Sequence, residues 1–271
     1  MPFITIQNQR LHYAEHRDDP RTPPMPLVLV HGAGGNLYHW PPGLRRLPGY
    51  DVYALDLPGH GKSEGPGRGS IDEYVSVVYD WARALDLPPF VLAGHSMGGA
   101  IAQTFALTHP DMLKGIVLAA TGARLRVHPK ILDGIQQDMA GVGEMLVDWA
   151  YGQKATPEQK RQFLKQFLAV PQDVMYGDWA ACNVFDIRDR LGEISVPALV
   201  ISGTMDVMTP EKYGRYMAER IPHADFALIE GGGHMLMLEQ PQMVTQAIRG
   251  FLDRLRADSS HAKTPKAQRK I

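Results

Sequence analysis

The feature of this sequence that most constrains its fold is a regular alternation of short apolar runs with helical patterns, interrupted once. Apolar runs cover residues 27–31, 51–56, 90–93 and 115–120. Between the second and third runs, apolar residues spaced three and four apart predict a helix over residues 70–87. Such alternation is typical of βαβ units, so it predicts a mostly parallel sheet with helices on both faces. Residues 3–7 and 11–16 are predicted to precede it as two strands joined by a turn at Asn8-Gln9.

The interruption lies between Gly122 and Glu193, where the pattern is helical only and rich in large apolar residues. The α/β rhythm returns with strands at 198–202 and 226–229 and a last helix that starts at Pro241. We therefore expect an α/β core domain made of residues 1–121 and 194–255, with residues 122–193 inserted as a helical cap. Residues 256–271 carry basic side chains and few apolar ones, which predicts a disordered basic tail.

Composition excludes several classes of protein. Lys and Arg number 28 against 29 Asp and Glu, a net charge of -1, so the basic footprint of a nucleic-acid binder is missing and no stable membrane anchor is expected. The apolar runs are too short to span a bilayer, and the charged N-terminus does not resemble a signal peptide, which favours a cytoplasmic location. The single cysteine, Cys182, excludes an intrachain disulfide.

The strongest chemical signal is the segment Gly94-His95-Ser96-Met97-Gly98, which fits the pattern G-x-S-x-G between a strand and a helix. A sharp strand-to-helix turn pushes the serine hydroxyl outwards, and the flanking glycines let neighbouring backbone approach closely. The helix N-terminus behind the serine directs free N–H groups at developing negative charge. The segment therefore predicts that Ser96 is a catalytic nucleophile.

A serine nucleophile needs a base and an acid that orients it. His234 follows the last predicted strand in a glycine-rich loop, at the carboxyl edge of the sheet where ligands bind in open α/β folds. Asp206 follows the strand at 198–202 at the same edge. The loop after residues 115–120 would be the rival place for the acid, but it has no carboxylate. Glu230 lies too early in its element to be the preferred acid.

The oxyanion of a tetrahedral intermediate needs two donors. The backbone N–H groups of Ala33, in the glycine-rich loop after the first apolar run, and of Met97 are the candidates. No metal or cofactor is expected. The segment Gly61-Lys62-Ser63 is similar to the end of a phosphate-binding loop, but Asp56 stands where that motif needs its first glycine.

Together these motifs resemble the α/β-hydrolase superfamily over nearly the whole chain, from residue 3 to about 255. The resemblance includes the loop at His31–Gly34, the segment from Asp56 to Ser63, the turn at Ser96 and the acid and base segments. It implies an eight-stranded, mostly parallel sheet and a helical cap, and the chain is similar to small bacterial carboxylesterases and monoacylglycerol-lipase-like enzymes. A serine nucleophile differs from the aspartate of haloalkane dehalogenases and epoxide hydrolases.

The expected function is that of a serine carboxylesterase that hydrolyses small carboxylic esters through an acyl-enzyme. Large apolar cap residues, among them Met145, Trp149, Met175 and Trp179, favour an apolar acyl group. Two alternatives stay open. The same triad could serve a C–C bond hydrolase or an acyl transferase, and a ligand-binding homologue could retain the triad and turn over slowly.

Overall fold

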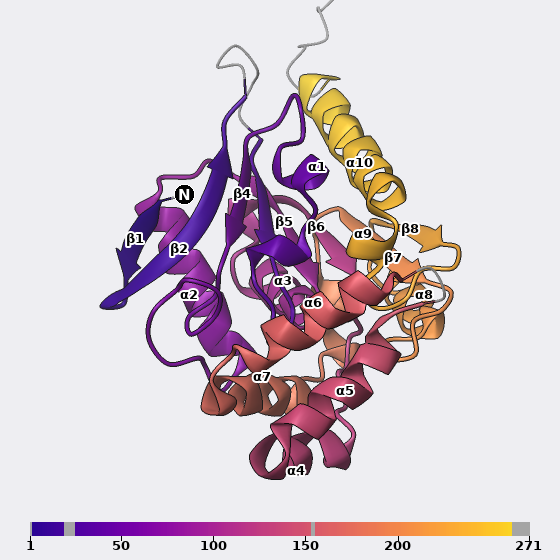
Figure 1. The fold of residues 1–271 in the computed structure, drawn as a ribbon. Coiled ribbons are helices and arrows are strands. Elements are labelled where there is room, and N and C mark those ends of the chain that lie inside the picture. The colour runs from indigo at the N-terminus through magenta and orange to yellow at the C-terminus, as the bar shows by residue number, and fades with distance from the viewer. Residues whose placement is uncertain (1, 19–24, 153–154, 262–271) are drawn as a thin grey trace, which may run out of the picture.

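The computed structural model describes residues 2–18, 25–152 and 155–261. An eight-stranded sheet runs through the centre of the molecule in the order β1-β2-β4-β3-β5-β6-β7-β8 (Figure 1). The pairs β1–β2 and β2–β4 are antiparallel, and every pair from β4 to β8 is parallel. The predicted fold class is therefore confirmed.

The strands have the following bounds: β1 Phe3–Ile6, β2 Gln9–His16, β3 Leu27–Val30, β4 Val52–Leu55, β5 Phe90–His95, β6 Leu113–Ala119, β7 Ala198–Gly203 and β8 Ala224–Ile229. The helices of the core are α1 Pro42–Arg45, α2 Ile71–Ala84, α3 Met97–Thr108, α8 Glu211–Ala218, α9 Leu236–Glu239 and α10 Pro241–His261. The inserted helices are α4 Pro129–Gln137, α5 Met139–Ala150, α6 Pro157–Leu168 and α7 Gln172–Val184.

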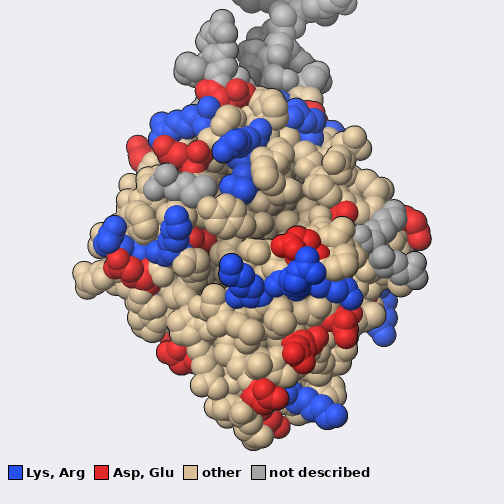
Figure 2. All heavy atoms as spheres, viewed as in Figure 1, with Lys and Arg blue, Asp and Glu red and all other residues tan. Residues whose placement is uncertain are grey.

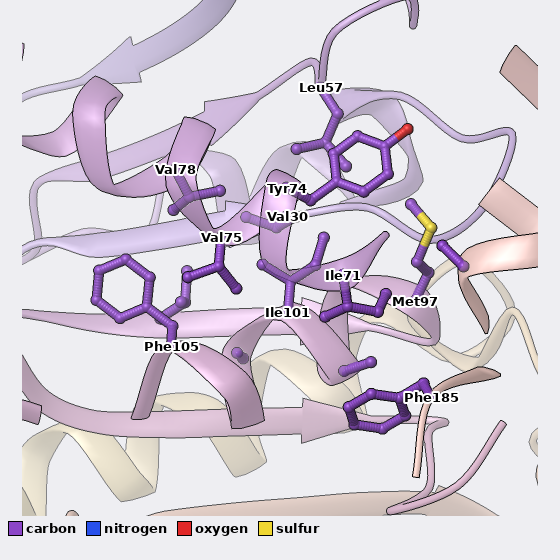
Figure 3. Close-up of a cluster of buried hydrophobic side chains, with 14 of the residues drawn as sticks. Val30, Leu57, Ile71, Tyr74, Val75, Val78, Met97, Ile101, Phe105 and Phe185 are labelled. Carbon is purple, nitrogen blue, oxygen red and sulfur yellow. The ribbon is translucent and has the colours of Figure 1, made fainter. Parts of the chain in front are cut away.

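The central strands are buried on both faces because helices cover both sides of the sheet. Side chains alternate between faces along each strand. Val28 and Val30 belong to the core cluster that includes α2, α3 and α8, whereas Leu27 and Leu29 belong to the cluster that includes α1 and α10. Figure 3 shows the first cluster, with Val30 among side chains of α2 and α3.

The inserted helices α4 to α7 lie together at one end of the molecule, beside the carboxyl ends of the parallel strands (Figure 1). The chain enters and leaves this cap through two adjacent segments, joined by an antiparallel bridge between Arg124 and Asp186. Acidic and basic side chains are intermixed on the face shown in Figure 2, in keeping with the near-zero net charge. Within the described part of the chain, no helix is both long and apolar enough to cross a membrane.

Several element boundaries differ from those predicted. The first turn is formed by Gln7 and Asn8, both at positive φ, instead of Asn8-Gln9. The sequence pattern indicates this helix only from Ala100 to Thr108, because Gly98 and Gly99 weaken the signal of its first turn, whereas α3 begins directly after Ser96. Helix α10 continues to His261, so residues 256–261 are helical where a disordered tail was expected. The remainder of that predicted tail, residues 262–271, lies outside the described residues.

Candidate active site

Ser96 occupies a strained turn between β5 and α3. Its backbone has φ 52° and ψ -114°, a conformation that costs a non-glycine residue of order 1–3 kcal/mol. Two glycines permit the turn. A Cβ on Gly94 would lie 1.9 Å from the carbonyl oxygen of Gly98, and a Cβ on Gly98 would lie 2.6 Å from two carbonyl oxygens of the segment that ends β3. The glycines of the G-x-S-x-G pattern are thus required by close backbone packing.

Hydrogen bonds hold the strained residue in place. The Ser96 N–H donates to the carbonyl of Ala119 at 3.0 Å, and the Thr121 hydroxyl donates to the Ser96 carbonyl at 2.8 Å. The side chain of the next residue, Met97, is fully buried and belongs to the core cluster that Figure 3 shows. The tip of the turn is therefore anchored on both sides of the serine.

The structure places His234 against Asp206. Nδ1 of His234 lies 3.0 Å from Oδ2 of Asp206, and both side chains are buried. The other oxygen, Oδ1, accepts the backbone N–H groups of Met208 and Thr209 at 2.9 and 2.8 Å. Asp206 therefore caps the turn before α8 and at the same time orients the histidine.

The charge state of Asp206 fixes the tautomer of the histidine. Burial alone would raise the pKa of Asp206, but His234 and the hydrogen bonds from Thr209 outweigh it and hold the pKa below its usual value. An ionised carboxylate can only accept, so Nδ1 of His234 carries the hydrogen. Nε2 is left to act as a base.

Ser96 and His234 line the same two adjoining pockets, of about 40 and about 50 Å³, which we call together the serine cavity. Most of its remaining wall comes from cap residues and is apolar: Leu146, Ala150, Phe163, Phe167, Trp179 and Cys182. Met208 and Met235 of the core also line it, and its polar wall includes Arg126, Thr209 and Tyr213. Of the four cap residues named from the sequence, only Trp179 is among the residues that line this cavity.

The two proposed oxyanion donors lie on either side of the serine. Ala33 lines the serine cavity, and Met97 is the first residue of α3. Neither N–H donates to an acceptor among the described residues. A Cβ on Gly32, the residue before Ala33, would lie 3.0 Å from the Cβ of Ser96, so this loop passes directly beside the serine.

Two histidines near the serine have structural partners. His31 accepts the Leu57 N–H at Nε2 and bonds the Gly32 carbonyl through Nδ1, and burial keeps its pKa well below the usual value. His95 donates from Nε2 to the carbonyl of His234 at 3.0 Å, and burial likewise lowers its pKa. These neutral rings fix the loops on both sides of the turn at Ser96.

Sequence reasoning missed Asp178, a fully buried carboxylate on cap helix α7. Its Oδ2 accepts the Gly34 N–H and His60 Nε2–H, each at 2.8 Å, and its Oδ1 accepts the Tyr74 hydroxyl. Burial alone would lower the pKa of His60, but the Asp178 carboxylate outweighs it and raises that pKa. An acidic residue within the apolar face of a helix was the one available signal.

Glu239, on α9, is a second carboxylate that the sequence reasoning did not identify. Its carboxylate accepts the N–H groups of Gly152, two residues after the end of the cap helix α5, and of Gly233, next to the histidine, at 2.8 and 3.1 Å. Its pKa is raised, chiefly by burial. Asp178 and Glu239 thus join the cap to the two loops that carry Ala33 and His234.

The segment from Asp56 to Ser63 is held by its own hydrogen bonds. The Asp56 carboxylate bonds Nδ1 of His12 at 2.7 Å and accepts the N–H groups of Leu37 and Lys62 at 2.7 and 3.0 Å. The lysine of the Gly61-Lys62-Ser63 segment therefore belongs to a loop that closes on a carboxylate. No group of three His, Cys, Asp or Glu side chains in the described ranges is arranged to hold a metal ion.

Comparisons with known proteins identify relatives that match most of this chain. The (E)-2-((N-methylformamido)methylene)succinate hydrolase of Acinetobacter baylyi is 28% identical over 258 residues, which cover 91% of this chain and 95% of that protein. The pimeloyl-[acyl-carrier protein] methyl ester esterase of Yersinia enterocolitica is 27% identical over 83% of this chain and 92% of its own length. A solved thermophilic esterase superposes with a TM-score of 0.82 at 31% identity, over 94% of this chain and 97% of its own.

The family profile described as "alpha/beta hydrolase fold" matches residues 25–241, which include Ser96, Asp206 and His234. The match covers most of the chain and every parallel strand of the sheet. This chain therefore belongs to the α/β hydrolase fold family, with esterases among its relatives.

Proposed function

We propose that the protein is a serine carboxylesterase that hydrolyses small esters with apolar acyl groups through an acyl-enzyme. The observation that carries this proposal is the pairing of His234 Nδ1 with Asp206 at 3.0 Å, in a cavity that Ser96 also lines. The pairing leaves His234 Nε2 as the proton acceptor next to a serine on a strained turn.

In the first half of the reaction, His234 Nε2 removes the proton of the Ser96 hydroxyl as the oxygen attacks the ester carbonyl. The oxyanion that forms is held by the N–H groups of Ala33 and Met97. The tetrahedral intermediate collapses when His234 returns the proton to the leaving alcohol. The products of this half are the free alcohol and an ester bond between the acyl group and Ser96.

In the second half, His234 Nε2 removes a proton from water, which attacks the acyl carbonyl. The same two N–H groups hold the second oxyanion. Collapse returns the proton from His234 to the Ser96 oxygen and releases the carboxylic acid. The Asp206 carboxylate stabilises the imidazolium form of His234 in both halves and keeps Nδ1 protonated throughout.

The lining of the serine cavity supports an apolar acyl group. Side chains such as Leu146, Phe163 and Trp179 remove apolar surface of a substrate from water but offer few partners to polar groups. Ester hydrolysis is also named for the Yersinia enterocolitica relative and for the solved thermophilic esterase. These names favour ester hydrolysis over the C–C bond hydrolase and acyl transferase alternatives.

The test is Ser96→Ala together with a fluorophosphonate probe. Wild type is expected to hydrolyse p-nitrophenyl butyrate with a burst of p-nitrophenol and to carry the probe on Ser96, as located by mass spectrometry of peptides. Ser96→Ala should retain its thermal unfolding midpoint and lose both turnover and labelling. Turnover by Ser96→Ala near the wild-type rate would contradict the proposal, and tight binding with a single slow turnover by wild type would favour the ligand-binding alternative.

A further inference from the structure

A second, larger cavity adjoins the serine cavity and has a different chemical character. Its volume is about 540 Å³. We call it the basic cleft, and its polar lining consists of Arg124, Arg126, Arg188, Lys212, Tyr213 and Tyr216. Arg126 and Tyr213 also line the serine cavity, so the two spaces share a wall.

The fold brings these cations together from three separate segments. Arg124 and Arg126 lie on the segment that enters the cap, where they alternate with the buried Leu125 and Val127. Arg188 follows the segment that leaves the cap, which is bonded to the entering one through the Ile187 N–H and the Ala123 carbonyl at 2.8 Å. Lys212 belongs to the first turn of α8. The arrangement therefore depends on the tertiary structure.

The cleft retains a positive charge after its internal ion pairs are counted. Asp186 bonds Arg188 at 2.7 and 2.8 Å and lies 3.6 Å from Arg124. Asp186, and to a smaller extent Asp189, raise the pKa of Arg188. Among the residues that the structure describes, Arg126 and Lys212 have no acidic partner within ion-pair distance. Four cations thus face two carboxylates, and the two unpaired cations include the one nearest the serine cavity.

The small volume of the serine cavity makes this neighbour relevant to the substrate. Its two pockets, of about 40 and 50 Å³, are far smaller than the basic cleft of about 540 Å³. A substrate longer than the serine cavity extends along the wall that leads out of it. On the side of Arg126 and Tyr213, this path enters the basic cleft.

We propose that the basic cleft binds an anionic group, a carboxylate or a phosphate, carried by the ester whose scissile bond lies at Ser96. This inference rests on the proposed function and adds the substrate class. Guanidinium groups bind the oxygens of both anions by charge-assisted, often bidentate hydrogen bonds. The tyrosine hydroxyls can donate additional hydrogen bonds to the same oxygens. A preferred substrate therefore has an apolar part at the serine cavity and an anionic end beyond Arg126.

The experiment compares matched charged and neutral esters. Monomethyl adipate is paired with dimethyl adipate, and 1-butyrylglycerol 3-phosphate is paired with 1-butyrylglycerol. For each pair, the quantity measured is the ratio of kcat/KM for the anionic ester to that for the neutral ester. A ratio above one for the adipate pair identifies a carboxylate ligand, and a ratio above one for the glycerol pair identifies a phosphate ligand. Ratios at or below one for both pairs overturn the proposal.

Charge-removing variants locate the effect. Arg126→Gln should lower the preferred ratio about tenfold, which corresponds to about 1.4 kcal/mol. Lys212→Gln should lower it in the same direction, and added salt should weaken the preference of wild type because exposed charges are screened. Lys114→Gln is the matched control, since Lys114 is exposed on β6 and lies outside the cleft lining. An equal loss in Lys114→Gln would reject the cleft as the cause.

Binding measured without turnover separates this proposal from the proposed function. Calorimetry with adipate and with inorganic phosphate should detect binding to wild type and to Ser96→Ala, and weaker binding to Arg126→Gln. If no neutral ester is hydrolysed, the esterase proposal is rejected, but the binding result still stands. Hydrolysis of neutral esters by Ser96, with no binding of either anion and no charge preference, would reject the basic cleft alone.

Discussion

The carboxylate of Asp178, on cap helix α7, accepts a hydrogen bond from the backbone N–H of Gly34 at 2.8 Å. Gly34 directly follows Ala33, whose N–H is one of the two proposed oxyanion donors. The orientation of one peptide group restricts that of the next, so the cap contributes to the geometry of this loop. We therefore expect the cap to position this loop in addition to lining the serine cavity.

Asp178→Asn tests this positioning role. One amide oxygen cannot replace the carboxylate for three donors, so we expect an unfolding free energy lower by about 1–3 kcal/mol. A displaced oxyanion donor should also lower kcat by roughly 10²-fold, with KM changed much less. Steady-state kinetics and urea unfolding measure the two effects.

The matched control for Asp178 is Asp173→Asn. Asp173 is exposed on the first turn of the same helix, so its substitution should leave kcat within about twofold and stability within about 0.5 kcal/mol, as for most surface sites. A normal kcat in folded Asp178→Asn would show that the bond to Gly34 only stabilises the fold.

The pair of His60 and Asp178 predicts a pH dependence of stability. The pKa of His60 is raised in the folded protein because Asp178 outweighs the effect of burial. A raised pKa adds stability that is fully present below the unfolded-state pKa of about 6.5 and is lost as pH rises through the folded-state pKa. Wild type should therefore exceed Asp178→Asn in unfolding free energy by more at pH 6 than at pH 9. A difference that is constant or grows with pH would show that His60 is neutral in the folded protein.

Asp206→Asn tests the assignment of the acid. The amide no longer stabilises the imidazolium form of His234, and in serine proteases the corresponding change lowers kcat by about 10⁴-fold. We expect a comparable loss here with the fold retained. Glu230→Gln is the control, because Glu230 is exposed. Its Oε1 accepts a long hydrogen bond of 3.4 Å from the Thr204 hydroxyl. A near-normal rate for Asp206→Asn with a severe loss for Glu230→Gln would assign the acid to Glu230 instead.

The parallel sheet could be predicted from the sequence because its signal is local. Strands such as Leu27–Val30 and Ala198–Gly203 are continuous apolar runs, as expected for strands buried on both faces. Ser96 was predicted from the G-x-S-x-G pattern, and Asp206 and His234 from the rule that parallel strands present their carboxyl ends at one edge.

The hydrogen bonds of the cap could not be predicted because they join distant residues. Gly34 and Asp178 are 144 positions apart, and Gly152 and Glu239 are 87 apart. Helical periodicity shows that a residue faces inwards but does not show what it meets. For the same reason the sequence named Met145 and Trp149 as pocket candidates, whereas Leu146 of the same helix lines the serine cavity.

Leu146→Ala tests whether the cap sets the length of the acyl group. Leu146 is almost fully buried on α5 and lines the serine cavity, so its truncation should enlarge the space beside Ser96. A methylene in such a pocket is worth roughly 1–3 kcal/mol, or a factor of about 10–200 in kcat/KM. The preference among p-nitrophenyl esters from acetate to octanoate should therefore move to longer chains.

Met145→Ala is the control, since Met145 is adjacent on α5 but is not among the residues that line the cavity. Thermal unfolding must show that Leu146→Ala remains folded, because truncating a buried leucine costs about 2–5 kcal/mol. If the folded variant keeps the wild-type length profile, acyl length is set by the core domain, with Met208 and Met235 as the next residues to vary.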